Sequence, residues 1–257
     1  MSIRFLALSW FCIAALTGSA PSPQKSAGPK PLTVITTILP YKTFIEAVGG
    51  DRVHVTVLIP PQANPHTYEL TPGQLKLIST ADIYIKVGTP IEFELTWADK
   101  LFSLNKRLVA GNSAAGITLL DGEEHTHTDR VSPGNDTQGT DPHIWLSPHN
   151  AIQIVRNIQD ILSKNDPDHA DYYQERAEAY RTELQKPDRT IQTRLTPYAG
   201  RSFLTYHPSW GYFAHRYRLT QLSIENEGKE ASPRSIARTI DAARDQNIHT
   251  IFIAPQI

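Results

Sequence analysis

The residues best suited to chemistry are three histidines that lie far apart in the chain, each in a short phrase with proline and aromatic neighbours. The phrases are Asn64-Pro65-His66-Thr67-Tyr68-Glu69, Asp141-Pro142-His143-Ile144-Trp145-Leu146 and Thr205-Tyr206-His207-Pro208-Ser209-Trp210. Imidazole is the commonest metal-binding side chain, and three imidazoles gathered by folding suit a divalent ion such as Zn²⁺. A nitrogen-rich site favours Zn²⁺ over Mn²⁺. The phrases therefore predict a zinc site formed by His66, His143 and His207.

A second group of possible metal ligands lies in the polar stretch 121–141. It contains His125 and His127 among several carboxylates, with few apolar residues to anchor it. Long loops without secondary structure are usually functional or disordered. Two interpretations stay open at this point: weak, exchangeable metal capture at the surface, or a solvated linker.

The composition of the chain argues against some classes of function and some types of metal ligand. The chain has 257 residues and a formal net charge of −1. Acids and bases alternate along it, and the absence of a basic run argues against nucleic acid as a partner. The single cysteine, Cys12, lies in the N-terminal apolar segment. We therefore expect a metal to be held by nitrogen and oxygen ligands, without thiolate.

The N-terminus resembles an export signal. Arg4 is followed by the apolar run Phe5–Leu16, which is short for a membrane span, and then by small residues and a Pro/Ser/Gly/Lys stretch. We expect residues 1–27 to be signal peptide and tether, with cleavage between Gly18 and Ala27, and the mature chain to be periplasmic or otherwise extracytoplasmic. An uncleaved membrane anchor is the alternative.

The rest of the chain alternates between strand and helix patterns, which predicts parallel strands in an α/β fold. The expected strands are Leu32–Ile38, Val53–Ile59, Ile83–Val87, Arg107–Val109, Ser202–Tyr206, Leu219–Ile224 and Thr250–Ile253. The expected helices are Tyr41–Val48, one beginning after Thr71, Ile91–Phe102, one from Ser147-Pro148 to Asn165, Asp168–Thr196, Trp210–Arg216 and Pro233–Asn247. Pro187 should kink or break the longest of them.

This pattern predicts two α/β lobes joined by a long helix. We expect an N-terminal lobe at 28–165, a linking helix at 166–197 and a C-terminal lobe at 198–257. His66 and His207 each follow a predicted strand, and ligands of open α/β sheets collect beyond the carboxyl ends of strands. A metal held by all three histidines would then lie between the lobes.

Together these phrases resemble the cluster A-I solute-binding proteins of ABC importers for zinc and manganese, of the ZnuA/TroA type, and most closely the zinc branch. The resemblance runs from about Leu32 to Ile257 and rests on several phrases in the same order. They are Pro65-His66-Thr67-Tyr68-Glu69, Asp141-Pro142-His143-Ile144-Trp145-Leu146-Ser147-Pro148, Tyr206-His207-Pro208-Ser209-Trp210-Gly211-Tyr212 and Glu227-Gly228-Lys229-Glu230-Ala231-Ser232-Pro233.

The resemblance implies that His66, His143 and His207 are the metal ligands and that the acidic histidine-bearing loop is the flexible loop of the zinc branch. The family's fourth ligand position lies beyond a strand that would follow Ile257, so we expect water as fourth ligand or an incomplete second lobe. Ser147 stands where the family often has an acidic residue, and we expect it to cap the following helix. The Glu225–Glu230 run is interpreted as a solvated loop.

The function this predicts is capture of Zn²⁺ by a monomer and its delivery to an ABC transporter membrane permease, without catalysis. A metal-binding surface adhesin and a non-functional truncated copy are the alternatives. A secreted zinc hydrolase is disfavoured, because the sequence has no His-Glu-x-x-His helix and no acid placed as an obvious general base.

Overall fold

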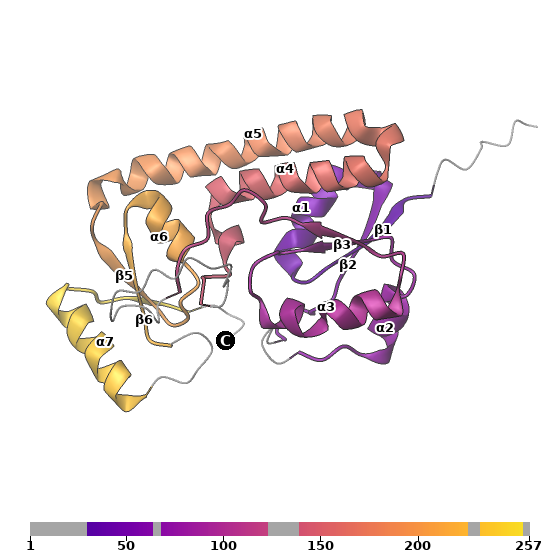
Figure 1. The fold of residues 1–257 in the computed structure, drawn as a ribbon. Coiled ribbons are helices and arrows are strands. Elements are labelled where there is room, and N and C mark those ends of the chain that lie inside the picture. The colour runs from indigo at the N-terminus through magenta and orange to yellow at the C-terminus, as the bar shows by residue number, and fades with distance from the viewer. Residues whose placement is uncertain (1–29, 64–67, 123–138, 226–231, 254–257) are drawn as a thin grey trace, which may run out of the picture. The chain divides into compact units, whose positions relative to one another are not determined.

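The computed structural model describes residues 30–63, 68–122, 139–225 and 232–253, and strands alternate with helices along most of them (Figure 1). The strands are β1 (Leu32–Thr36), β2 (Val53–Val57), β3 (Ile83–Lys86), β4 (Val109–Asn112), β5 (Ser202–Thr205), β6 (Thr220–Ser223) and β7 (Ile251–Phe252). The helices are α1 (Leu39–Gly49), α2 (Pro72–Ile78), α3 (Glu92–Leu104), α4 (Pro148–Asn165), α5 (Ala170–Leu195), α6 (Gly211–Tyr217) and α7 (Pro233–Asp245). None of these helices is long and apolar enough to cross a membrane.

The first sheet has the strand order β2-β1-β3-β4, and all its neighbouring strands are parallel. Its central strands are buried on both faces, as parallel strands between helices must be. Figure 1 shows α1, α4 and α5 on one side of this sheet and α2 and α3 on the other. The core is formed largely by Val34, Ile35, Ile45, Ile83, Ile85, Leu101, Ile154, Ile158 and Tyr173, all of which are almost completely buried.

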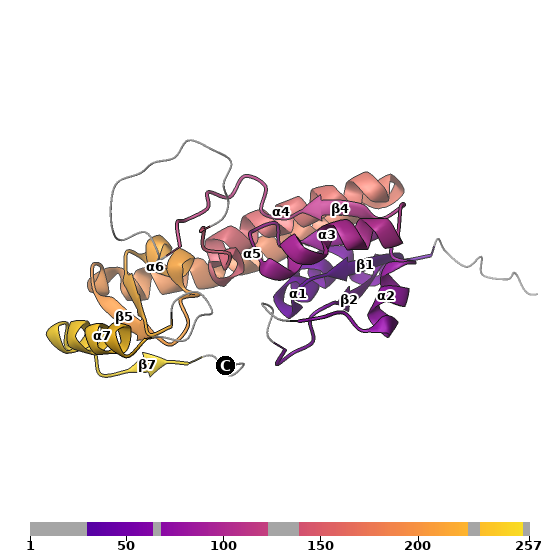
Figure 2. The same ribbon diagram turned by 60° about the horizontal axis from the view of Figure 1, so that its bottom comes forward.

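The second sheet is smaller and has the order β6-β5-β7, again parallel. Figures 1 and 2 show α6 and α7 on different sides of β5 and β6. This placement is what right-handed crossovers require, because the connection through α6 and the return through α7 run in opposite directions across the sheet. Two parallel α/β sheets confirm the predicted fold class.

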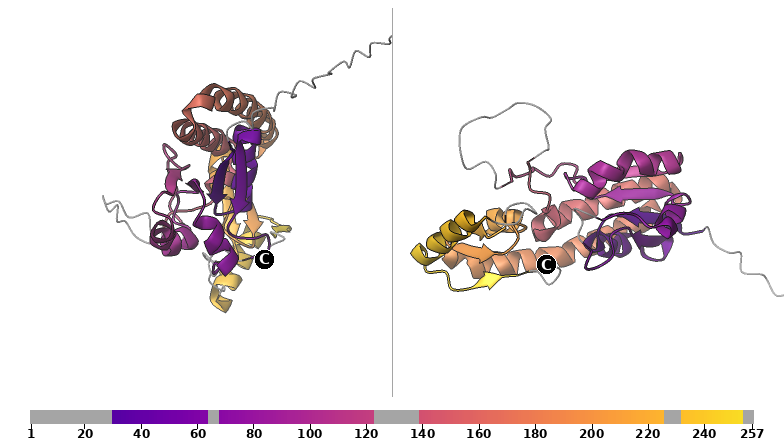
Figure 3. Two further views of the ribbon diagram at one scale, coloured as in Figure 1. Left: turned by 90° about the vertical axis from the view of Figure 1, so that its right-hand side faces the viewer. Right: turned by 90° about the horizontal axis from the view of Figure 1, so that it is seen from below.

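Helices α4 and α5 follow each other through a short turn and lie side by side (Figures 1 and 3). The α5 helix continues from Ala170 to Leu195 through Pro187, so of the expected kink or break the break was wrong. Proline removes one backbone hydrogen bond and crowds the preceding turn, but tertiary contacts can compensate for that cost. One such contact is immediately adjacent, since Asp188 is buried and bonded to Arg216 and Tyr217 of α6.

Most predicted elements coincide with observed ones, and the local helix signals explain why. Thr71 and Gln74 form a capping box at α2, and the Ser232 hydroxyl accepts a hydrogen bond from the Ser235 amide at α7. Two further expectations, about where a strand and a helix begin, were wrong. The fourth strand begins at Val109, where the Arg107–Val109 run was expected to end, and Ser147 precedes α4 without any side-chain capping bond. The predicted signal segment 1–27 lies outside the described residues, and the predicted lobe boundaries stay predictions.

Candidate metal site

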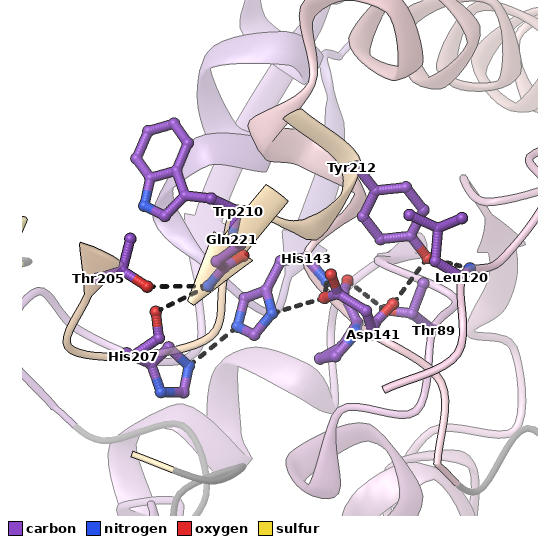
Figure 4. A network of polar contacts seen from close by, with 10 residues as sticks. Thr89, Leu120, Asp141, His143, Thr205, His207, Trp210, Tyr212 and Gln221 are labelled. Atoms are coloured by element: carbon purple, nitrogen blue, oxygen red, sulfur yellow. Dashed lines mark hydrogen bonds and ion pairs between the residues drawn. The ribbon is translucent and has the colours of Figure 1, made fainter. Parts of the chain in front are cut away.

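The structure brings His143 and His207 together from segments far apart in the chain. Their Nε2 atoms lie 3.2 Å apart, and the two ring planes are inclined at 82° (Figure 4). His143 directly precedes the short 3₁₀ turn Ile144–Leu146 that leads into α4, while His207 follows strand β5. Both side chains are largely shielded from solvent. Two of the three predicted ligands therefore lie in contact through their Nε2 atoms.

A carboxylate fixes the orientation of the His207 ring. Nδ1 of His207 donates to Oε2 of Glu225 over 3.0 Å, and both side chains are mostly buried. The sheet explains their meeting: Thr205 of β5 is in register with Ser223 of β6, so the residues two positions beyond each strand emerge side by side. A backbone hydrogen bond from the Glu225 amide to the Tyr206 carbonyl continues this pairing past the strand ends.

Glu225 corrects an expectation from the sequence. It was assigned to a solvated acidic run, but its side chain is only 15% exposed and bonded to His207. The signal that could have found it was its place after a strand parallel to the one that precedes His207. The rest of that run, 226–230, lies outside the described residues.

A second carboxylate fixes the His143 ring in the same way. Oδ1 of Asp141 accepts hydrogen bonds from both the backbone amide and Nδ1 of His143, each over 2.8 Å. Pro142 lies between them and restricts the backbone, so that the carboxylate and the ring belong to one tight Asp-Pro-His turn. Asp141 stands in the phrase that the sequence singled out, but nothing in the spacing identified its role.

The turn that carries His143 is held by its neighbours. Asp141 donates its amide to the Leu120 carbonyl over 2.8 Å, and Asp121 and Thr140 form an antiparallel bridge beside it. The Thr89 hydroxyl, on the loop after β3, donates to the Pro142 carbonyl over 3.0 Å. The His143 ring also contacts the Trp145 ring. Backbone and side-chain contacts thus restrict both ends of the turn.

A buried carboxyl group supports the loop that carries Thr89. Glu94 of α3 is almost fully buried and accepts hydrogen bonds from the amides of Val87 and Gly88, and from the Thr37 hydroxyl. Burial raises the pKa of Glu94, although these hydrogen bonds act in the opposite direction. Glu94 therefore fixes the backbone at the carboxyl end of β3, directly before Thr89.

This arrangement has the chemistry of a metal site. A neutral imidazole that donates from Nδ1 has an unprotonated Nε2, and carboxylate partners at Nδ1 are the common outer partners of metal-binding histidines. Two unprotonated nitrogens at 3.2 Å repel each other unless a cation lies between them. Two nitrogens bound to one tetrahedral Zn²⁺ at ~2.0–2.1 Å lie about 3.3 Å apart. The observed separation suits that geometry.

The other predicted ligands cannot be placed. His66 lies in 64–67, and His125 and His127 lie in 123–138, all outside the described residues. Within the part of the chain that is described, no three His, Cys, Asp or Glu side chains form a group suited to hold a metal. The assignment of His66 and the role of the His125/His127 loop stay predictions.

Residues 34–257 match the family described as "ZnuA: Zinc-uptake complex component A periplasmic". The chain belongs to this family. The match covers the second sheet, all of the first sheet except the first two residues of β1, and both positioned histidines. It also confirms the resemblance to the zinc branch that the histidine phrases carried.

Relatives and solved structures agree with the family assignment. The chain is 30% identical to the high-affinity zinc uptake system protein ZnuA of Bacillus subtilis over 96% of its length and 79% of that protein. It is 35% identical to the zinc-binding lipoprotein AdcA of Streptococcus pneumoniae over 86% of its length, but spans only 44% of AdcA. A crystal structure of ZnuA superposes with a TM-score of 0.79 at 36% identity, covering 89% of this chain and 84% of that one.

Proposed function

We propose that the chain binds Zn²⁺ outside the cytoplasm and passes it to an ABC importer permease as the solute-binding component of a zinc-uptake system. The observation that carries this proposal is the pair of Nε2 atoms 3.2 Å apart, each on a ring whose Nδ1 donates to a carboxylate. Membership of the ZnuA family and the zinc-related names of its relatives support the metal and the transport role.

In this proposal His143 and His207 supply two nitrogen ligands, His66 supplies the third and water the fourth. Asp141 and Glu225 act through the rings: each fixes the tautomer and orientation of one imidazole and makes its Nε2 a better donor to the metal. Because their contacting oxygens face Nδ1, the described ligand atoms are nitrogens, which favours Zn²⁺ over Mn²⁺. The signal segment 1–27 would deliver the protein across the membrane.

The proposed role is capture and release, without catalysis. The adhesin and truncated-copy alternatives, like the zinc hydrolase, have no separate observation in their favour. They differ from the proposal in the fate of the bound zinc: only a transport component should support zinc-dependent growth through a permease.

The test is a competition titration of Zn²⁺ and Mn²⁺ against a chromophoric chelator, using the mature chain and the variants His66→Ala, His143→Ala and His207→Ala. We expect one tight zinc site that each substitution weakens by at least about 100-fold, since each removes a ligand. His54→Ala, in strand β2, is the control and should bind as the unsubstituted chain does. Tight zinc binding that survives loss of His143 and His207 together would contradict the proposed site.

Delivery needs its own experiment. A bacterial strain that has lost its own ZnuA-type protein but keeps the permease is grown with limiting zinc while expressing this chain or its His143→Ala/His207→Ala variant. Growth restored by the unsubstituted chain alone supports delivery. Zinc binding without restored growth, in a strain where a native ZnuA restores it, would favour the adhesin or the truncated copy.

A further inference from the structure

Helix α6 reaches across to the turn that carries His143. The Tyr212 hydroxyl of α6 donates to the Asp141 carbonyl over 2.8 Å and accepts from the Leu120 amide over 3.1 Å (Figure 4). Tyr212 is only 5% exposed. Its hydroxyl therefore joins both backbone segments that lie side by side at 120–122 and 139–141.

The residue before Tyr212 lies against the side chain of the same aspartate. A Cβ atom added to Gly211 would lie 2.4 Å from Oδ2 of Asp141, which is far closer than non-bonded atoms approach. The other oxygen of that carboxylate, Oδ1, accepts both hydrogen bonds from His143. The carboxylate thus fits between the first turn of α6 and the His143 ring, and only glycine leaves room for it.

Helix α6 also belongs to the segment that positions His207. It begins four residues after His207, and the amide of Trp210 donates to Gln221, whose side chain in turn donates to Thr205 and to the His207 carbonyl. One short segment, 207–212, therefore contains a proposed ligand and the two residues that contact the carboxylate partner of the other ligand.

We propose that Gly211 and Tyr212 are positioning residues that set the geometry of His143 through Asp141, so that the segment carrying one proposed ligand orients the other. The predicted effect of Gly211 and Tyr212 on zinc affinity rests on the proposed function, whereas their predicted effect on the Asp141 turn does not. Tyr212 fixes the Asp141 backbone, and Gly211 leaves the space in which the carboxylate can face the ring. Neither residue contacts the metal in this proposal.

The test compares matched variants of the mature chain. Tyr212→Phe removes the two hydrogen bonds to the turn, and Gly211→Ala displaces the Asp141 carboxylate. Tyr217→Phe is the control for the first, because Tyr217 lies on the same helix, is similarly buried and donates over 2.9 Å to Asp188 instead. Gly73→Ala, in α2, is the control for the second, since its added Cβ would meet no atom closer than 4.0 Å.

The first measurement needs no metal. Amide hydrogen exchange in the zinc-free protein should accelerate at Leu120 and His143 by about 3-fold or more in Tyr212→Phe, and at His143 in Gly211→Ala, because these amides bond to Tyr212 and Asp141. The two controls should leave both amides unchanged. Unchanged exchange at His143 in Tyr212→Phe and Gly211→Ala would overturn the inference whether or not the chain binds zinc.

The second measurement is the zinc dissociation constant. We expect it to rise about 3- to 10-fold in Tyr212→Phe and about 10-fold or more in Gly211→Ala, while Tyr217→Phe and Gly73→Ala bind as the unsubstituted chain does. An equal loss in Tyr217→Phe would mean that any loosening of α6 weakens the site, and would overturn the specific role of Tyr212. Failure of the unsubstituted chain to bind zinc would refute the proposed function, and the exchange data would still decide the inference.

Discussion

Arg216 of α6 donates two hydrogen bonds to Asp188 of α5, from Nε over 3.0 Å and from Nη2 over 2.6 Å. Tyr217 adds a third bond to the same carboxylate, which is 6% exposed. This paired geometry is the strongest form that an Arg–carboxylate contact takes. It fastens α6 to α5, so this contact should contribute to the stability of the fold.

This contact predicts a pH dependence of stability. Burial opposes ionisation of Asp188, but the hydrogen bonds from Arg216 and Tyr217 and the charge of Arg216 outweigh it and lower its pKa. A carboxyl group whose pKa is lowered by folding stabilises the protein above its unfolded pKa of about 3.9 and loses that contribution as the pH falls through its folded pKa. Asp188→Asn should cost about 1–3 kcal/mol of unfolding free energy near neutral pH.

Urea unfolding of the zinc-free protein between pH 7 and pH 3 measures this effect. The difference between the unsubstituted chain and Asp188→Asn should be constant above about pH 5 and shrink below about pH 4. A difference that stays the same down to pH 3 would show that the charge of Asp188 does not contribute.

The contribution of Glu94 to stability should depend on pH in the opposite direction to that of Asp188. Because burial raises its pKa, its contribution to stability is full below an unfolded pKa of about 4.3 and declines as the pH rises through the folded pKa. Glu94→Ala leaves the Val87 and Gly88 amides without their side-chain acceptor and should cost about 2–4 kcal/mol. That cost should increase as the pH is lowered from neutral toward the unfolded pKa.

The same unfolding experiment tests Glu94, with Glu46→Ala on the exposed side of α1 as control. The control should change the unfolding free energy by less than about 1 kcal/mol. A cost for Glu94→Ala that decreases toward acid pH would contradict the raised pKa.

Glu225 predicts a change in zinc affinity without direct contact with the metal. Glu225→Ala removes the acceptor of the His207 Nδ1 proton and should weaken zinc binding about 10- to 100-fold, as loss of such partners does in other metal sites. Glu178→Ala removes a carboxylate of the same kind that is 64% exposed on α5, and should leave affinity unchanged. Equal zinc affinities for the two variants would contradict a role for Glu225 in the site.

Replacing Pro187 with alanine should increase the stability of the protein. Its ring leaves the Glu183 carbonyl without the usual helical donor, so Pro187→Ala should restore one hydrogen bond and stabilise the protein by about 1–3 kcal/mol. Zinc affinity should not change, because Pro187 is exposed on α5, and no contact of its side chain with His143 or His207 is found among the described residues. Thermal unfolding measures the gain in stability, with Lys186→Ala as the control. A loss of stability would mean that α5 needs the local geometry that proline imposes.

The order of most helices and strands, the α/β class and the family could be predicted from the sequence, as could the interest of the histidine phrases. These are local signals: strand and helix patterns, the Thr71–Gln74 capping box and motifs such as Asp141-Pro142-His143 are readable from neighbouring residues. Prediction from the sequence failed where the structure depends on contacts between residues far apart in the chain. Pro187 lies within a continuous helix, and the adjacent Asp188 is bonded to Arg216 of α6, a contact that no local rule contains.

The orientation of the side chains in the candidate site depends on tertiary contacts. Glu225 reaches His207 because two parallel strands are in register, and Asp141 is confined because Gly211 and Tyr212 pack against it from another segment. Residue types suggest which side chains can bind a metal, but the direction of a ring depends on what its second nitrogen contacts. Those contacts form between segments far apart in the chain, so they exist only once both sheets have folded.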